Sequence, residues 1–142
     1  MIGGKKSERV MNEKYILLVE DNSNDVALTI KALNKCHIQN QLVVVTDGPE
    51  ALEYLLSPDL EKRPAVVILD LKLPFIDGFE VLRQIRANTN TQHLPVFILS
   101  SSVDENDRLK SMKLGANGYE CKPISFNDFV VLMHRICLEW VL

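Results

Sequence analysis

Two runs of apolar residues in this chain end directly in carboxylates, and this arrangement constrains the fold more than any other feature. Residues 65–69, Ala-Val-Val-Ile-Leu, lead into Asp70, and residues 15–19, Tyr-Ile-Leu-Leu-Val, lead into Glu20 and Asp21. A strand that is apolar on both faces belongs inside a parallel sheet, and ligands of such sheets bind just beyond the carboxyl ends of the strands. Because an unpaired buried charge costs several kcal/mol, these three acids are candidate site residues.

A cation is the simplest partner for three carboxylates that meet at neighbouring strand ends, since they would otherwise repel one another. Oxygen ligands without Cys or His suit a hard ion such as Mg²⁺. Either acidic feature alone is explained equally well by a helix cap or an acidic loop, but the two together favour a metal site. The three cysteines and three histidines lie at no zinc-ligand spacing, and the cysteines are interpreted as reduced packing residues. A Cys-His nucleophile pair is compatible with the spacing, but no local signature supports one.

The length of 142 residues suffices for one domain with a core and leaves no room for a second. No apolar run approaches the roughly 18 residues that a membrane span needs. A net charge of -3 and the lack of a concentrated basic face argue against direct binding to nucleic acid. Residues 1–13 are predicted to be a flexible N-terminal leader and residues 14–142 the domain. The leader lacks the apolar core of a signal peptide, which predicts a cytoplasmic protein.

Five short apolar runs alternate with five segments of helical periodicity, which predicts an α/β protein with a doubly wound parallel sheet. The predicted strands are residues 15–19, 42–45, 65–69, 96–99 and 118–121. The predicted helices start near residues 22–24, 49, 78, 105 and 125. Asn22, Ser23 or Asn24 can cap the first of them, and Ser125, with Asp128 three residues later, resembles a capping box at the start of the last. The helix at about 105–114 has a thin apolar stripe and is expected to be the least firmly held, with Gly115 as a left-handed cap. The apolar end at residues 140–142, Trp-Val-Leu, predicts a docking or self-association edge.

Polar residues also follow the later strands, with Ser100 after the fourth and Lys122-Pro123 after the fifth. Together with the acids after the first and third strands, this constellation closely resembles the receiver domain of two-component response regulators. The similarity spans nearly the full length. It implies a flavodoxin-like (βα)5 fold with strand order 2-1-3-4-5, which sets the first and third strands side by side and brings their acids together.

The resemblance assigns a role to each acid. Asp70 matches the aspartate that accepts a phosphoryl group. Glu20 and Asp21 match the acidic pair that holds Mg²⁺, with Asp70 and the backbone carbonyl of Lys72 as further ligands. The metal would act as an electrostatic clamp and template for phosphoryl transfer.

Three further residues acquire roles from the same resemblance. Ser100 matches the hydroxyl that binds the phosphoryl oxygen, and Lys122 the lysine that pairs with it. Tyr119 matches the aromatic side chain whose rotamer changes with Ser100 when the site switches. The resemblance also implies a cis peptide bond between Lys122 and Pro123. Taken singly, Ser100 is explained as a helix cap, Lys122 as a solvated turn residue and Tyr119 as a half-buried strand residue.

The function that the resemblance implies is that of a stand-alone regulator. It would be phosphorylated on Asp70 by a histidine kinase or a histidine phosphotransfer protein and would signal to an output protein through its fourth helix, fifth strand and fifth helix. Its only chemistry would be Mg²⁺-dependent self-phosphorylation and self-dephosphorylation. The final residues loosely resemble those of small regulators that serve bacterial phytochromes. Two alternatives are an adaptor that acts without phosphorylation and a haloacid-dehalogenase-like phosphatase, but the second aspartate that the phosphatase needs is replaced by Lys72.

Overall fold

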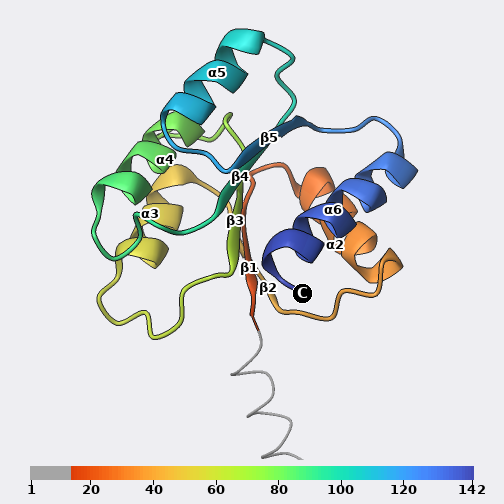
Figure 1. Cartoon of the computed structure of the whole chain (residues 1–142), viewed down its shortest axis with the longest axis horizontal. Helices are drawn as coiled ribbons and strands as arrows, with labels where there is room; N and C mark the ends of the chain where they lie inside the picture. The colour runs from red at the N-terminus through yellow and green to blue at the C-terminus, as the bar shows by residue number, and fades with distance from the viewer. Residues whose placement is uncertain (1–13) are drawn as a thin grey trace, which may run out of the picture.

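The computed structural model describes residues 14–142, and the predicted leader lies outside the described residues. Strands and helices alternate along this part of the chain (Figure 1). In chain order they are β1 (Ile16–Val19), α2 (Ser23–Lys35), β2 (Leu42–Val45), α3 (Gly48–Leu56), β3 (Val66–Leu69), α4 (Gly78–Ala87), β4 (Val96–Ser100), α5 (Glu105–Lys113), β5 (Gly118–Cys121) and α6 (Phe126–Trp140). The strands form one parallel sheet in the order β2-β1-β3-β4-β5, which confirms the predicted order and the (βα)5 fold.

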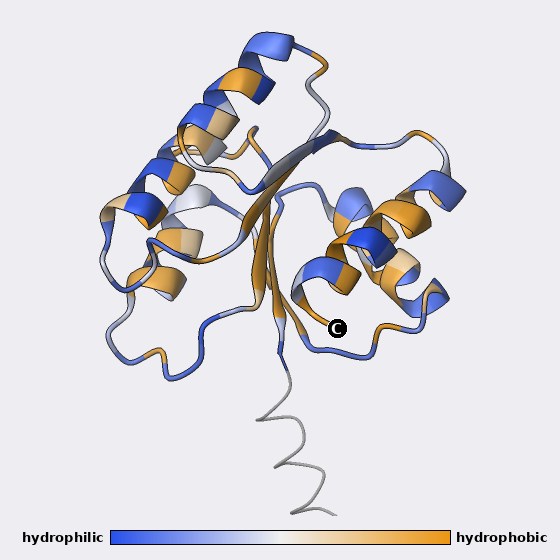
Figure 2. Ribbon diagram, in the orientation of Figure 1, coloured by the Kyte–Doolittle hydropathy of each residue, from blue (hydrophilic) through white to orange (hydrophobic). Residues whose placement is uncertain are grey.

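The sheet is the middle layer of three (Figure 1). Helices α3, α4 and α5 lie on one side of it, and α2 and α6 lie on the other. Strands β1, β3 and β4 are buried along their whole length, because side chains on both faces have a helical layer to pack against. Leu17 and Val67 pack toward α3 and α4, whereas Ile16 and Ile68 pack toward α2 and α6. Figure 2 shows these central strands as the most hydrophobic part of the fold.

The register of the central strands positions the acids. Val19 of β1 is opposite Leu69 of β3, so that Glu20 and Asp70 leave the sheet side by side. The backbone N–H of Asp70 donates to the carbonyl of Val19 at 3.1 Å and extends the ladder by one residue. Parallel pairing therefore converts two separate strand ends in the sequence into one site in space.

Side-chain caps fix where the helices begin. Of the three candidates at the start of α2, it is Asn22 whose side chain accepts hydrogen bonds from the backbone N–H groups of Asn24 and Asp25. Ser125 caps α6 as predicted, since its side chain accepts from the N–H of Asp128. The Asn22 cap holds the first turn of α2 beside the carboxyl end of β1.

Helix α5 is the least buried of the helices in the described part of the chain, as its thin apolar stripe predicts. Ser111 is its only buried residue, and Leu109 and Met112 of the apolar stripe are 47% and 41% exposed. Gly115 follows the helix with φ of 100°, which confirms the left-handed cap. Helix α5 lies next to the edge strand β5 (Figure 1).

The predicted docking edge at the end of α6 is wrong for two of its three residues. Val141 is 4% exposed, and Trp140 packs its ring edge-on against Phe97 of β4. Only Leu142 projects into solvent. These side chains complete the core between α6 and the sheet, because the last turn of the helix lies over β4, and they give no support to self-association. Within residues 14–142, no helix combines the length and the apolar composition needed to cross a bilayer.

Candidate functional site

The structure brings the three predicted acids together at the carboxyl ends of β1 and β3. Carboxylate oxygens of Glu20, Asp21 and Asp70 all lie within 4.8 Å of one another. Glu20 and Asp70 are buried, whereas Asp21 is exposed. They line a hollow of about 630 Å³, to which the start of α2, Lys72 and Lys122 also contribute. Such a set of hard oxygen donors fits a divalent cation.

The loop after β3 holds Asp70 by close backbone contacts. The N–H of Gly78 donates to the carbonyl of Leu71 at 2.8 Å, and the N–H of Lys72 lies 3.4 Å from one carboxylate oxygen of Asp70. A Cβ atom on Gly78 would lie only 2.3 Å from the carbonyl oxygen of Asp70. A glycine is therefore required where α4 begins, because the helix starts against the backbone of the candidate nucleophile.

Lys122 reaches into the acidic hollow from the loop after β5. Its Nζ atom lies 2.7 Å from Oε1 of Glu20, 2.8 Å from Oδ2 of Asp25 and 3.3 Å from Oδ2 of Asp70. Asp25 was not predicted as a site residue. It lies in the first turn of α2, three residues after the Asn22 cap, and this cap holds the turn beside the carboxyl end of β1.

The electrostatics of the hollow follow from this crowding. Burial is the largest influence on Glu20 and raises its pKa to about 7, although the hydrogen bond from Lys122 acts in the opposite direction. Burial alone would lower the pKa of Lys122, but the hydrogen bonds to Asp25 and Glu20 keep that pKa above its usual value. One ammonium thus faces several carboxylates, and the remaining negative charge favours a further cation.

The predicted cis peptide bond is wrong. No cis peptide bond occurs within residues 14–142, so Lys122 and Pro123 are joined in the trans form. Lys122 still points at the acids, because its long side chain spans the distance and the carboxylates attract its ammonium group. Lys122 thus reaches the acids with a trans peptide bond before Pro123.

Ser100 and Tyr119 lie on neighbouring strands, and both contact the loop after β4. Ser100 is fully buried, and its hydroxyl accepts a hydrogen bond from the N–H of Ser102 at 3.1 Å. The hydroxyl of Tyr119 donates to the carbonyl of Ser102 at 3.0 Å, while the hydroxyl of Ser102 donates to Asp107 at 2.6 Å. Ser102 therefore ties both predicted switch residues to the start of α5.

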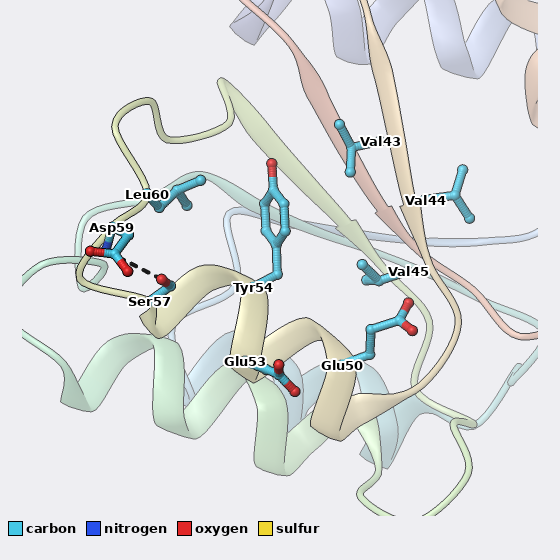
Figure 3. A pocket seen from close by; sticks show the side chains of 9 residues that line it. All are labelled: Val43, Val44, Val45, Glu50, Glu53, Tyr54, Ser57, Asp59 and Leu60. Carbon is cyan, nitrogen blue, oxygen red and sulfur yellow. Dashed lines mark hydrogen bonds between the residues drawn. The ribbon is translucent and has the colours of Figure 1, made fainter.

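A second hollow of about 650 Å³ lies along the edge strand β2 (Figure 3). It is lined by Val43 and Val45 together with residues of α3 such as Glu53 and Tyr54, and it shares no residue with the acidic site. Among the described residues, the only cluster of potential metal ligands is the one formed by the three acids. The acidic hollow is therefore the candidate functional site.

This fold, with an acid cluster and a lysine at the carboxyl ends of its strands, defines a phosphoacceptor module of the receiver class. Residues 16–134 match the response regulator receiver domain family, and the chain belongs to that family.

Three relatives are similar over nearly their whole length. RcpA, a cyanobacterial phytochrome response regulator solved in its phosphorylated form, is 35% identical, with 90% of this chain and 94% of RcpA covered and a TM-score of 0.82. Response regulator Rcp1 of Synechocystis is 34% identical, with 90% of this chain and 89% of Rcp1 covered, and has been solved in a Mn²⁺-bound form with a TM-score of 0.80. The bacteriophytochrome response regulator AtBRR is 43% identical, with 92% and 97% covered and a TM-score of 0.75.

Proposed function

We propose that this chain is a stand-alone response regulator that accepts a phosphoryl group on Asp70 and signals through contacts with another protein. The observation that carries the proposal is the buried carboxylate of Asp70, which shares one cluster with Glu20 and Asp21 and faces the ammonium group of Lys122. An ionised carboxylate is already a nucleophile and needs no separate base. In the transfer, a carboxylate oxygen of Asp70 bonds to phosphorus as the bond from phosphorus to the donor imidazole nitrogen breaks, and the nitrogen keeps the electron pair.

Glu20, Asp21 and Asp70, with the backbone carbonyl of Lys72, are the residues that would hold Mg²⁺. The cluster of carboxylate oxygens fits a hard ion, and Rcp1 has been solved with Mn²⁺, which prefers the same ligands. The bound ion would neutralise charge on the phosphoryl oxygens. The chain itself supplies the orientation, because β1 and β3 hold the acids in register.

Lys122 and Ser100 are proposed to contact the transferred group. The Lys122 ammonium lies 3.3 Å from Asp70 and needs only a short movement to pair with a phosphoryl oxygen. To donate to the same group, the Ser100 hydroxyl must approach it with its loop, and Tyr119 must give up its hydrogen bond to the Ser102 carbonyl before it can turn inward. Only a few hydrogen bonds change between the unphosphorylated and phosphorylated states. A single phosphorylation can therefore shift the equilibrium between them.

The donor and the output are the parts of the proposal that rest on relatives. RcpA and AtBRR are described as phytochrome response regulators, so we propose a phytochrome-linked histidine kinase, or a phosphotransfer protein that it serves, as the phosphoryl donor. The output surface would be α5, β5 and α6, next to the Tyr119 switch. The cytoplasmic location, the domain boundary at residue 14 and self-association as a homodimer stay predictions.

Incubation of the purified protein with acetyl phosphate and Mg²⁺, followed by intact mass measurement, tests the proposal. We expect one phosphoryl group per chain, and none when the metal is removed with a chelator. A folded protein that gains no phosphoryl group from acetyl phosphate or from a phosphorylated kinase would favour the adaptor that acts without phosphorylation.

Lys72→Ala is expected to tighten Mg²⁺ binding and to change the lifetime of the phosphorylated state. The Lys72 side chain is exposed and lines the acidic hollow, where its positive charge opposes a cation. Solvent screening limits the effect to about 1 kcal/mol, which is roughly fivefold in affinity. Calorimetric titration with Mg²⁺ measures it. Lys31→Ala, an exposed change in α2, is the control, and equal affinities for both variants and the unaltered protein would show that Lys72 is a solvated bystander.

A further inference from the structure

Lys122 and a divalent cation would compete for the carboxylates of Glu20 and Asp70, whereas Asp25 contacts the lysine alone. We propose that Asp25 is a positioning residue, which keeps the Lys122 ammonium at the pocket when a metal ion occupies Glu20 and Asp70. The inference rests on the proposed function, because it requires Mg²⁺ at those two carboxylates.

The geometry separates Asp25 from the metal ligands. Its carboxylate lies 2.8 Å from the Lys122 ammonium, which is closer than the 3.3 Å of Asp70. It is not part of the cluster in which Glu20, Asp21 and Asp70 can share one ion. Among the described residues, Lys122 is its only side-chain partner. Asp25 is thus placed to hold the lysine and not the metal.

Metal binding would leave the lysine with a single partner. A cation that draws on Glu20 and Asp70 takes two of the three carboxylates that surround the ammonium group. The Lys122 side chain is only 13% exposed, so water compensates poorly for carboxylate contacts that the ammonium group loses. Without Asp25, the ammonium would either stay on the metal ligands and compete with the ion or leave the pocket. With Asp25, it moves aside by a short distance and remains available for a phosphoryl oxygen.

The position of Asp25 is stable because of its helix. The Asn22 cap accepts a hydrogen bond from the N–H of Asp25 itself, at 3.1 Å, and fixes the first turn of α2. An acid there is also favourable next to the helix N-terminus. Asp25 can therefore act as a fixed anchor while the flexible lysine moves.

A double-mutant cycle on Mg²⁺ affinity tests the inference. Asp25→Asn, Lys122→Met and the double variant are titrated with Mg²⁺ alone by calorimetry. We expect Asp25→Asn to weaken Mg²⁺ binding by about fivefold when Lys122 is present. In the Lys122→Met background the same change should have little effect, because no ammonium competes. Asp128→Asn, in the first turn of α6, is the matched control for loss of a first-turn acid and should leave affinity unchanged.

The outcomes distinguish the alternatives. Equal weakening in both backgrounds would show that Asp25 acts on the metal by its own charge, and no weakening in either would show that it does nothing at the site; both overturn the inference and leave the proposed function intact. An unaltered protein that binds no Mg²⁺ would instead overturn the proposed function.

A second measurement does not depend on the Lys122→Met variant folding. In nitrogen-15 spectra, the Lys122 ammonium of the Mg²⁺-saturated protein should stay protected from solvent exchange and should lose that protection in Asp25→Asn. Retained protection in Asp25→Asn would contradict the inference.

Discussion

Asp70→Asn is expected to abolish phosphoryl uptake from either a small donor or a kinase. The substitution removes the charged nucleophile and keeps the size of a buried side chain. Stability should not fall, because Glu20 and Asp25 still pair with Lys122 and repulsion within the acid cluster is reduced. Intact mass after incubation with donor and Mg²⁺ measures uptake, and thermal unfolding measures stability.

Asp59→Asn is the control for this experiment, because Asp59 is an exposed acid in the second hollow beside β2 (Figure 3). It should gain one phosphoryl group as the unaltered protein does. A phosphoryl group found on the Asp70→Asn protein would place the acceptor elsewhere and overturn the assignment.

Gly78→Ala is expected to lower the free energy of unfolding more than Gly115→Ala does. The new Cβ would lie 2.3 Å from the Asp70 carbonyl oxygen and 2.7 Å from the Leu71 Cα atom, and both are backbone atoms that cannot rotate away. Overpacking of this kind costs about 3 kcal/mol or more. Urea unfolding measures the loss. Because the strain falls on Asp70, phosphoryl uptake at a temperature where the variant is folded should also slow.

Gly115→Ala gives the comparison that isolates backbone crowding. Gly115 has φ of 100°, which an alanine adopts with strain of about 1–2 kcal/mol, but the nearest neighbours of its Cβ would be side-chain atoms of Arg86 at 3.0 Å or more and not backbone atoms. We expect a smaller loss of stability and normal phosphoryl uptake. A loss for Gly78→Ala no greater than that for Gly115→Ala would show that the loop after β3 adjusts and does not hold Asp70 rigidly.

The parts of the fold that were predictable are those in which local pattern and long-range packing agree. Apolar runs that end in Glu20 and Asp70 specify buried parallel strands, because only a sheet covered on both faces accepts them. The Ser125 cap and the Gly115 stop are local features of the chain, and the structure has both. Strand order came from the family resemblance, since no local pattern determines which strands are neighbours.

The parts that were missed depend on contacts between distant segments. Asp25 and Lys122 are 97 residues apart, and the local sequence around neither residue predicts their ion pair. The cis bond before Pro123 was taken from the family and failed, because the reach of a lysine makes it unnecessary. The prediction of an exposed docking edge at the end of the chain was wrong for a similar reason. The sequence alone does not show that Trp140 packs against a strand of the sheet.

Trp140 is the only tryptophan in the sequence, and its ring lies 5.9 Å from that of Phe97, centroid to centroid. Phe97 belongs to β4, the strand that ends in Ser100. All tryptophan fluorescence of the protein therefore originates at one contact with the strand that carries the proposed switch. A displacement of β4 changes the surroundings of the indole ring and hence its emission, so the chain contains an optical reporter that needs no label.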